Sequence, residues 1–171
     1  NLKNNLIYEA YAHCFEVCGE KIVPLEFKLA SDIPMSRGLG SSAACVIMGI
    51  MAAFDVMKKD FDKKEILKIA TDMEGHPDNV SPAIFGGGTA AICDKGQVFV
   101  EKFNVSDKIK FLALIPDFKL STKVARQALP KTYARDDEAF NFSRLSLLIL
   151  SLNSGDEENI KVALEDKIHE P

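Results

Sequence analysis

The chain has 171 residues, of which 47% are hydrophobic and 27% charged, and this is the composition of an ordinary globular protein. Its formal net charge is −4, and lysines and acids are interspersed, so there is no basic stripe to indicate a nucleic-acid partner. No apolar run reaches the roughly 18 residues of a membrane span, which argues against a membrane partner.

The first part of the chain is predicted to hold three helices and three strands. In chain order these are a helix over 5–18, a strand over 21–33, a long buried helix over 41–58, a helix from 63 to about 73, and strands over 89–93 and 97–103. Asp62 is a good N-cap for the third helix, and Glu65 completes a capping box. Residues 94–96 form a candidate hairpin turn, and 74–88 are rich in turn residues.

The second part of the chain begins with a polar stretch, 104–108, that is predicted to link two domains. The elements predicted after it are a buried strand over 111–115, a short helix from Ser121 that Pro130 terminates, an apolar helix over 139–153 and an amphipathic helix over 157–168. Helices and strands do not alternate regularly along the whole chain, so the predicted fold class is α+β.

A glycine- and serine-rich run, Pro-Met-Ser-Arg-Gly-Leu-Gly-Ser-Ser-Ala-Ala over 34–44, lies at the entrance to the long helix. A helix N-terminus has unpaired N–H groups and partial positive charge, and glycines let a phosphate approach the backbone. The run therefore favours phosphate binding over an ordinary serine-capped turn. It is not a P-loop, because no lysine follows Gly40, and Ala43 excludes the dinucleotide fingerprint.

A second run, Glu-Gly-His-Pro-Asp-Asn-Val-Ser-Pro-Ala over 74–83, places two carboxylates, an imidazole and an amide within six residues. Such a cluster on a loop can bind a metal ion or orient a hydroxyl group. The alternative is structural: Asp78 and Asn79 cap the next element, and His76 faces solvent. The residues of this run leave these two interpretations evenly balanced.

A third stretch, Ser-Thr-Lys-Val-Ala-Arg over 121–126, begins the predicted short helix. Thr122 and Arg126 are four residues apart, so they share one helix face. A guanidinium is a planar fork that suits a carboxylate, although Arg126 could equally be a solvated helix charge.

Together the three stretches resemble the GHMP kinases, whose phosphate motif reads Pro-x-x-x-Gly-Leu-Gly-Ser-Ser-Ala. The second and third stretches are similar to the homoserine kinase branch of that family, with Ser81 as the one departure from the usual alanine. The resemblance covers essentially the whole chain. It implies an N-terminal domain like domain 2 of ribosomal protein S5 over 1–106, followed by the start of a ferredoxin-like C-terminal domain over 107–171.

The resemblance implies that ATP phosphorylates the side-chain hydroxyl of L-homoserine, on the way to threonine. The residues that it implies for ATP are Pro34, Ser36, Arg37, Gly38, Leu39, Gly40, Ser41 and Ser42. It further implies Mg²⁺ on Ser42 and Glu74, two oxygen ligands of the kind this cation prefers. The residues implied for homoserine are His76, Asp78, Thr122 and Arg126, with Arg126 on the carboxylate.

The resemblance implies Glu74, Asp78 and Asn79 as catalytic residues, and the identity of any catalytic base stays open. The resemblance places Asn79 near the reacting hydroxyl, and an amide cannot act as a base near neutral pH. We expect Asn79 to orient that hydroxyl while the proton passes to the γ-phosphate or to water.

Two other functions compete with this one. The acceptor could be mevalonate or a sugar, although the 74–79 loop and Arg126 argue against both. The chain could also be a non-catalytic nucleotide-binding module, but the site residues are all present.

The sequence starts without methionine, and the family's first strands and third motif would lie outside it, so we expect an internal fragment. Family members alone suggest a homodimer.

Four cysteines, Cys14, Cys18, Cys45 and Cys93, are scattered and lack partners at zinc-site spacing. Reduced thiols that pack as small apolar residues are the favoured interpretation. Such thiols fit a cytoplasmic location.

Overall fold

The computed structural model describes residues 5–35, 37–115, 117 and 129–169. The chain divides into two compact units, Asn1–Lys102 and Phe103–Pro171, which are described separately below. Helices and strands are both present, which confirms the α+β class. None of the described helices is both long enough and apolar enough to cross a membrane.

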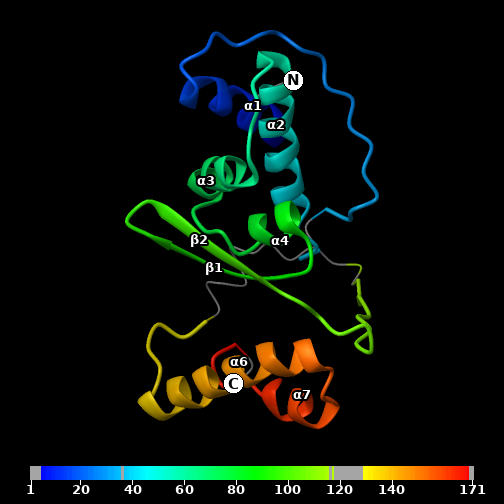
Figure 1. Cartoon of the computed structure of the whole chain (residues 1–171), viewed down its shortest axis with the longest axis vertical. Helices are drawn as coiled ribbons and strands as arrows, with labels where there is room; N and C mark the ends of the chain where they lie inside the picture. Colours follow the sequence, from blue (N-terminus) through cyan, green and yellow to red (C-terminus); the bar gives the residue numbers. More distant parts are fainter. Residues whose placement is uncertain (1–4, 36, 116, 118–128, 170–171) are drawn as a thin grey trace. The chain divides into compact units, whose positions relative to one another are not determined.

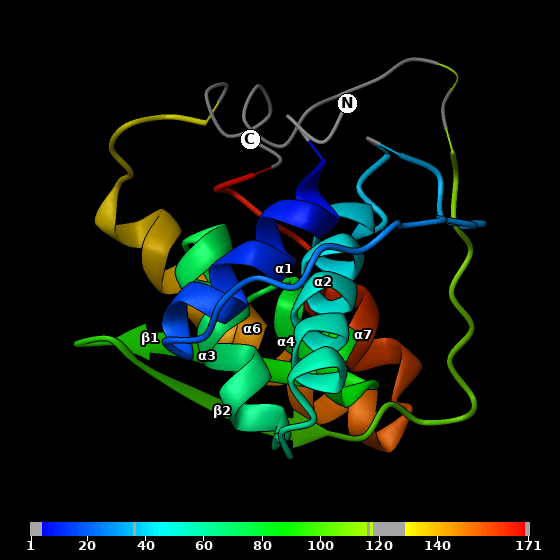
Figure 2. The same cartoon turned by 90° about the horizontal axis from the view of Figure 1, so that it is seen from above.

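The first unit consists of four helices followed by a β-hairpin (Figure 1). The elements in chain order are α1 (Leu6–Val17), α2 (Ser41–Met57), α3 (Lys63–Glu74), α4 (Val80–Phe85), β1 (Gly88–Asp94) and β2 (Gln97–Phe103). These bounds confirm the predicted helices over 5–18, 41–58 and 63–73 and the two predicted strands of the hairpin. Seen from above, α1 and α2 lie side by side (Figure 2).

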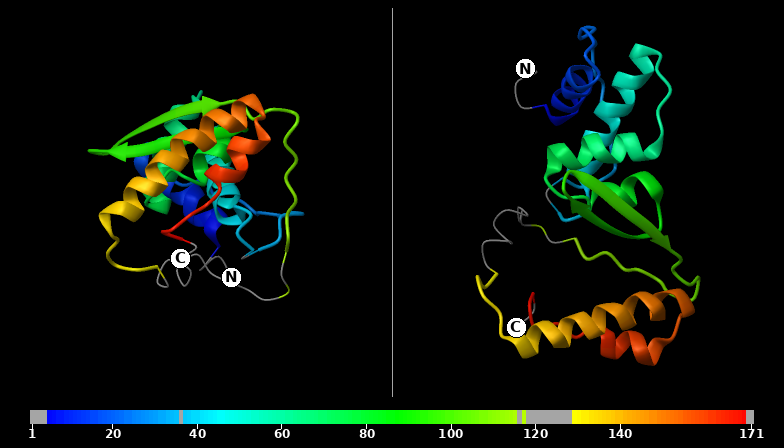
Figure 3. Two further views of the ribbon diagram at one scale, coloured as in Figure 1. Left: turned by 90° about the horizontal axis from the view of Figure 1, so that it is seen from below. Right: turned by 60° about the vertical axis from the view of Figure 1, so that its left-hand side comes forward.

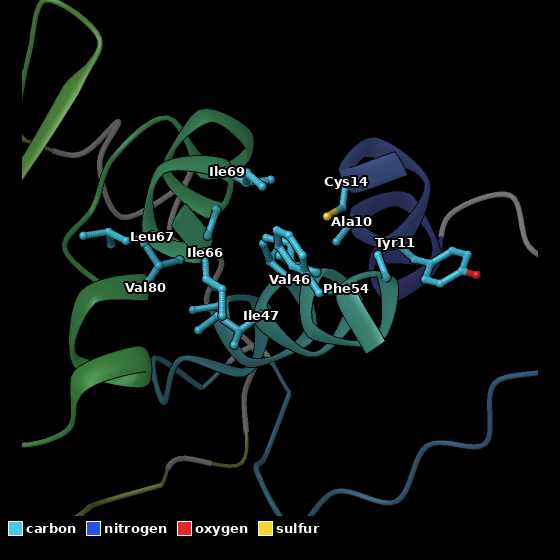
Figure 4. Packing of buried hydrophobic residues seen from close by; sticks show 14 of the residues in the cluster. Ala10, Tyr11, Cys14, Val46, Ile47, Phe54, Ile66, Leu67, Ile69 and Val80 are labelled. Atoms are coloured by element: carbon cyan, nitrogen blue, oxygen red, sulfur yellow. The ribbon is translucent and has the colours of Figure 1, made fainter. Parts of the chain in front are cut away.

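The core of this unit is built around α2. Figure 4 shows Val46 and Phe54 of α2 between Cys14 of α1 and Ile69 of α3, and all four side chains are buried. Burial on both sides explains why α2 is apolar around most of its circumference, as expected of a helix inside a core. The position of α2 is therefore fixed by two neighbouring helices.

Local side-chain chemistry sets the ends of these elements. The side-chain oxygen of Asn5, Oδ1, accepts hydrogen bonds from the N–H groups of Ile7 and Tyr8 and caps α1. The Asp62 carboxylate accepts one from the Glu65 N–H at 2.7 Å, which confirms the predicted cap of α3. Lys95 and Gly96 both have positive φ, as a two-residue hairpin turn requires.

The strand predicted over 21–33 is wrong: these residues are extended but form no ladder. The described residues contain one two-stranded sheet, β1–β2, so the segment has no neighbouring strand there. Aromatic side chains of α1 contact it instead. The Tyr11 hydroxyl donates to the Val23 carbonyl at 2.7 Å, and the Phe27 ring lies edge-on to Tyr11 at 5.4 Å.

One helix was not predicted, and one further predicted strand is wrong. Within the turn-rich residues 74–88, Val80–Phe85 forms the short helix α4. Six residues are too few to show helical periodicity, and Pro82 is tolerated because first-turn N–H groups are unpaired in any case. The buried strand predicted over 111–115 is neither buried nor paired within the described residues, and Leu112 is 86% exposed.

The second unit contains α6 (Arg135–Ser154) and α7 (Glu157–Ala163), which pack against each other (Figure 3). The first begins four residues earlier than predicted, because three acidic residues in its first turn complement the helix dipole. The second ends five residues earlier, because the Asp166 carboxylate binds the Ile168 and His169 N–H groups. The helix predicted from Ser121 lies outside the described residues.

All four cysteines are free thiols, which confirms that none forms a disulfide. Cys14 is buried in the core, and this burial, with a smaller contribution from Cys18, raises the pKa of the Cys14 thiol to about 12. Cys93 is exposed, so packing as a small apolar residue does not describe it.

Gly49 allows α1 and α2 to approach closely, so Gly49→Ala should destabilise the first unit. An added Cβ would overlap the Ile7 carbonyl oxygen and lie 2.7 Å from the Ala10 Cβ. We expect the free energy of unfolding to fall by about 1–3 kcal/mol, as for other overpacked cores. Urea unfolding followed by circular dichroism measures it. The neighbouring Met48→Ala, at an exposed position, is the control, and equal stability of the two variants would contradict the close approach.

Candidate functional site at the N-terminus of α2

The N-terminus of α2 begins at a glycine and has no side-chain cap. Gly40 is its N-cap in the left-handed region (φ 73°) and supplies no side-chain cap, and Gly38 has a similar φ of 74°. The first backbone hydrogen bond of the helix runs from the Ala44 N–H to the Gly40 carbonyl at 3.0 Å. The amides of Ser41, Ser42 and Ala43 therefore have no partner within the helix and can donate to a bound anion.

A carboxylate from the next helix lies beside this N-terminus. The Ser42 hydroxyl donates a hydrogen bond of 2.6 Å to Glu74 Oε1. Ser42 lies in the first turn of α2 and Glu74 is the last residue of α3, so the packing of these two helices brings the atoms together. The structure thus joins two of the predicted site residues that are far apart in the sequence.

The loop after α3 carries three further predicted site residues, His76, Asp78 and Asn79. Gly75, with φ 81°, ends α3, and the chain then turns through His76, Pro77 and Asp78. His76 Nδ1 contacts Asp78 Oδ1, and the same oxygen accepts the Asn79 N–H at 3.0 Å. The His76 side chain is 27% exposed and that of Asp78 59%.

Asn79 is exposed, and its side chain makes no capping hydrogen bond to α4. Asn79 occupies the N-cap position of α4, as the structural alternative has it, but its amide takes no part in the cap. That amide can face a ligand, which is compatible with a role in orienting a hydroxyl group.

Other predicted site residues lie in the turn before α2 or outside the described residues. Pro34 and Arg37 are half-buried and Leu39 is exposed, all in the turn before α2. Ser36, Thr122 and Arg126 lie outside the described residues, so their predicted roles stay predictions.

Two contacts that support the loop were not predicted from the sequence. The Pro77 carbonyl accepts hydrogen bonds from both the N–H and the hydroxyl of Ser81. The Lys102 ammonium donates to the Phe85 carbonyl at 2.7 Å, at the end of α4. The spacing of Ser81 four residues after Pro77 was a signal for the first contact. No local signal exists for the second, which depends on how the hairpin folds back.

The donor set is compatible with a magnesium ion. Mg²⁺ takes oxygen ligands and is commonly held by one or two carboxylates together with phosphate oxygens and water. Ser42 and Glu74 offer a hydroxyl and a carboxylate oxygen 2.6 Å apart, next to the open amides of α2. Among the described residues there is no cluster of three or more His, Cys, Asp or Glu side chains that could hold a metal unaided.

Comparison with known proteins identifies the class. Residues 5–87 match the family profile of the GHMP kinases N terminal domain, a range that includes α1 to α4 and the site just described. Residues 5–87 therefore form a GHMP kinase N-terminal domain.

Two relatives of this chain share one name. A protein of Clostridium botulinum named homoserine kinase is 52% identical over 168 residues, which are 98% of this chain and 57% of that protein. A protein of the same name from Clostridium acetobutylicum is 41% identical and matches 100% of this chain and 58% of the relative. The chain thus spans less than two thirds of these relatives.

A solved structure shares the fold. The crystal structure of homoserine kinase from Cytophaga hutchinsonii superposes with a TM-score of 0.79 at 24% identity, and the match covers 100% of this chain and 56% of that one. The likeness extends over both units of the chain, each of which therefore has a counterpart in a protein of this fold.

Proposed function

We propose that the whole protein is a homoserine kinase, which transfers the γ-phosphate of ATP to the side-chain hydroxyl of L-homoserine. The observation that carries this proposal is the contact between Ser42 and Glu74 beside the open N-terminus of α2. It provides adjacent groups for phosphates and for a cation, which phosphoryl transfer requires. The two clostridial relatives named homoserine kinase support the choice of acceptor.

ATP is held chiefly by backbone atoms in this proposal. The N–H groups of Ser41 and Ser42 and the glycine turn at Gly38 and Gly40 surround the phosphates, with Pro34, Ser36, Arg37 and Leu39 completing the binding turn. Ser42 and Glu74 are the residues that would hold Mg²⁺, which would neutralise charge on the phosphates. Because the amides are fixed by the helix, little reorganisation is needed when negative charge develops.

The acceptor is held by side chains of the 74–79 loop and of the segment over 121–126. His76 and Asp78 face the substrate as a hydrogen-bonded pair, and Thr122 and Arg126 bind it from the other segment, with the guanidinium on the α-carboxylate. Asn79 orients the reacting hydroxyl. Its amide cannot take the proton, which leaves for the γ-phosphate or for water.

The remaining features of the proposal follow from this activity. The product, O-phospho-L-homoserine, assigns the enzyme to threonine biosynthesis in this proposal. The proposed cytoplasmic location is supported by the free thiols. Residues 1–106 form the N-terminal nucleotide-binding domain, and 107–171 begin a ferredoxin-like C-terminal domain. The proposal of a homodimer is supported only by other members of the family.

An ADP-release assay on the whole protein tests the proposal. ATP with Mg²⁺ is offered together with L-homoserine, mevalonate or galactose in parallel. We expect ADP only with homoserine. Release with another acceptor would reassign the substrate, and ATP binding without turnover on any acceptor would favour a nucleotide-binding module.

The variant Asp78→Asn tests whether the reaction proceeds without a general base from the protein. The amide oxygen still accepts hydrogen bonds, so the contacts with His76 and the Asn79 N–H can persist. We expect turnover to fall by less than about a hundredfold, the lower end of what a general base contributes. Asn79→Ala, which removes the orienting amide, provides the comparison. Abolished turnover in Asp78→Asn, with both substrates still bound, would show that Asp78 is the base.

Gly40→Ala tests the phosphate-binding turn. A side chain at φ 73° is strained by about 1–2 kcal/mol, and relaxation would tilt the first-turn amides away from the phosphates. We expect ATP affinity, measured by calorimetry, to fall at least about tenfold, as the loss of one or more charge-assisted hydrogen bonds predicts. Gly19→Ala is the matched control: its φ is 68° and, like Gly40, it has no atom within 4 Å of an added Cβ. Equal losses in both variants would refute a specific role for the turn.

A further inference from the structure

The Pro77 carbonyl, in the loop between α3 and α4, is held by two hydrogen bonds. It accepts the Ser81 N–H at 2.9 Å and the Ser81 hydroxyl at 2.7 Å. Ser81 is fully buried, and so is its neighbour Val80, whose side chain belongs to the core. Two donors from one buried residue therefore fix both the position and the direction of this carbonyl.

The residue whose carbonyl is fixed in this way, Pro77, lies between His76 and Asp78. These are the two residues of the loop that we propose to bind homoserine. His76 precedes Pro77 and Asp78 follows it, and their side chains contact each other across that residue. Near neutral pH an ionised Asp78 can only accept, so the His76 imidazole carries its proton on Nδ1 in this contact. Rotation of the Pro77 carbonyl would move the Asp78 backbone and separate the pair.

We propose that the Ser81 hydroxyl is a positioning group for the His76–Asp78 pair, an inference that rests on the proposed function for its effect on substrate binding. The Ser81 N–H keeps one hydrogen bond to Pro77 when the hydroxyl is removed. The hydroxyl adds the second bond, which restricts rotation of the carbonyl. Its loss therefore changes the orientation of the pair without removing either partner.

The test is Ser81→Ala in the whole protein, with Ser146→Ala as the matched control. The Ser146 hydroxyl makes the same type of hydrogen bond, to the carbonyl four residues earlier (Phe142, 3.1 Å), but on an exposed face of α6. KM for homoserine should rise about three- to tenfold in Ser81→Ala, as expected for a small misplacement of binding groups. KM for ATP should stay within about twofold, because the amides of α2 are unchanged.

A second measurement does not depend on turnover. Nitrogen-15 spectra of the imidazoles at about pH 8, where histidine is neutral, show which ring nitrogen carries the proton. The His76 signals, assigned with His76→Gln, should indicate an Nδ1 proton in the unchanged protein and in Ser146→Ala. In Ser81→Ala they should shift toward a mixture of the two tautomers.

The outcomes separate the two proposals. If the alanine variants at 81 and 146 have the same KM for homoserine and the same His76 spectrum, the Ser81 hydroxyl is only structural and the inference is overturned. If no acceptor is phosphorylated even by the unchanged protein, the proposed function fails. The His76 spectrum then decides on positioning, because an unaltered signal in Ser81→Ala overturns it and an altered one supports it.

Discussion

The close contact between α1 and α2 at Gly49 is the constraint on which the rest of the first unit depends. Because this residue has no side chain, the backbone of α1 can lie directly against α2. The apolar side chains of α2 then pack against α1 and α3, so the axis of the helix cannot shift. The groups offered to an anion are backbone amides at its N-terminus. The position of the site is therefore set by core packing rather than by the loops around it.

Much of this architecture could be predicted because it depends on local signals. Asp62 capped α3 as its spacing from Glu65 predicted, and the Lys95-Gly96 pair made the hairpin turn. The errors occurred where structure depends on distant partners. Alternating residues over 21–33 satisfy the pattern of a strand, but a strand forms only when a neighbouring one supplies hydrogen bonds. The short helix α4 was missed because six residues show no periodicity.

The site shows the same division between local and distant information. Motifs identified Ser42 and Glu74 individually, but their 2.6 Å contact arises from the packing of α2 against α3 and could not be predicted. The contact between His76 and Asp78 was not predicted either, although these residues are neighbours in the sequence. Ser81 was a minor departure from a family motif, and its importance emerged only from its burial and its bond to Pro77.

The extended segment over 21–33 has a consequence for how the chain behaves in solution. It exposes alternating apolar side chains, with Ile22 at 46% and Leu29 at 53%, and its backbone has no ladder within the described part of the chain. Neither side chain belongs to the buried core cluster. Charged substitutions at these two positions would therefore reduce the exposed apolar surface without touching the core.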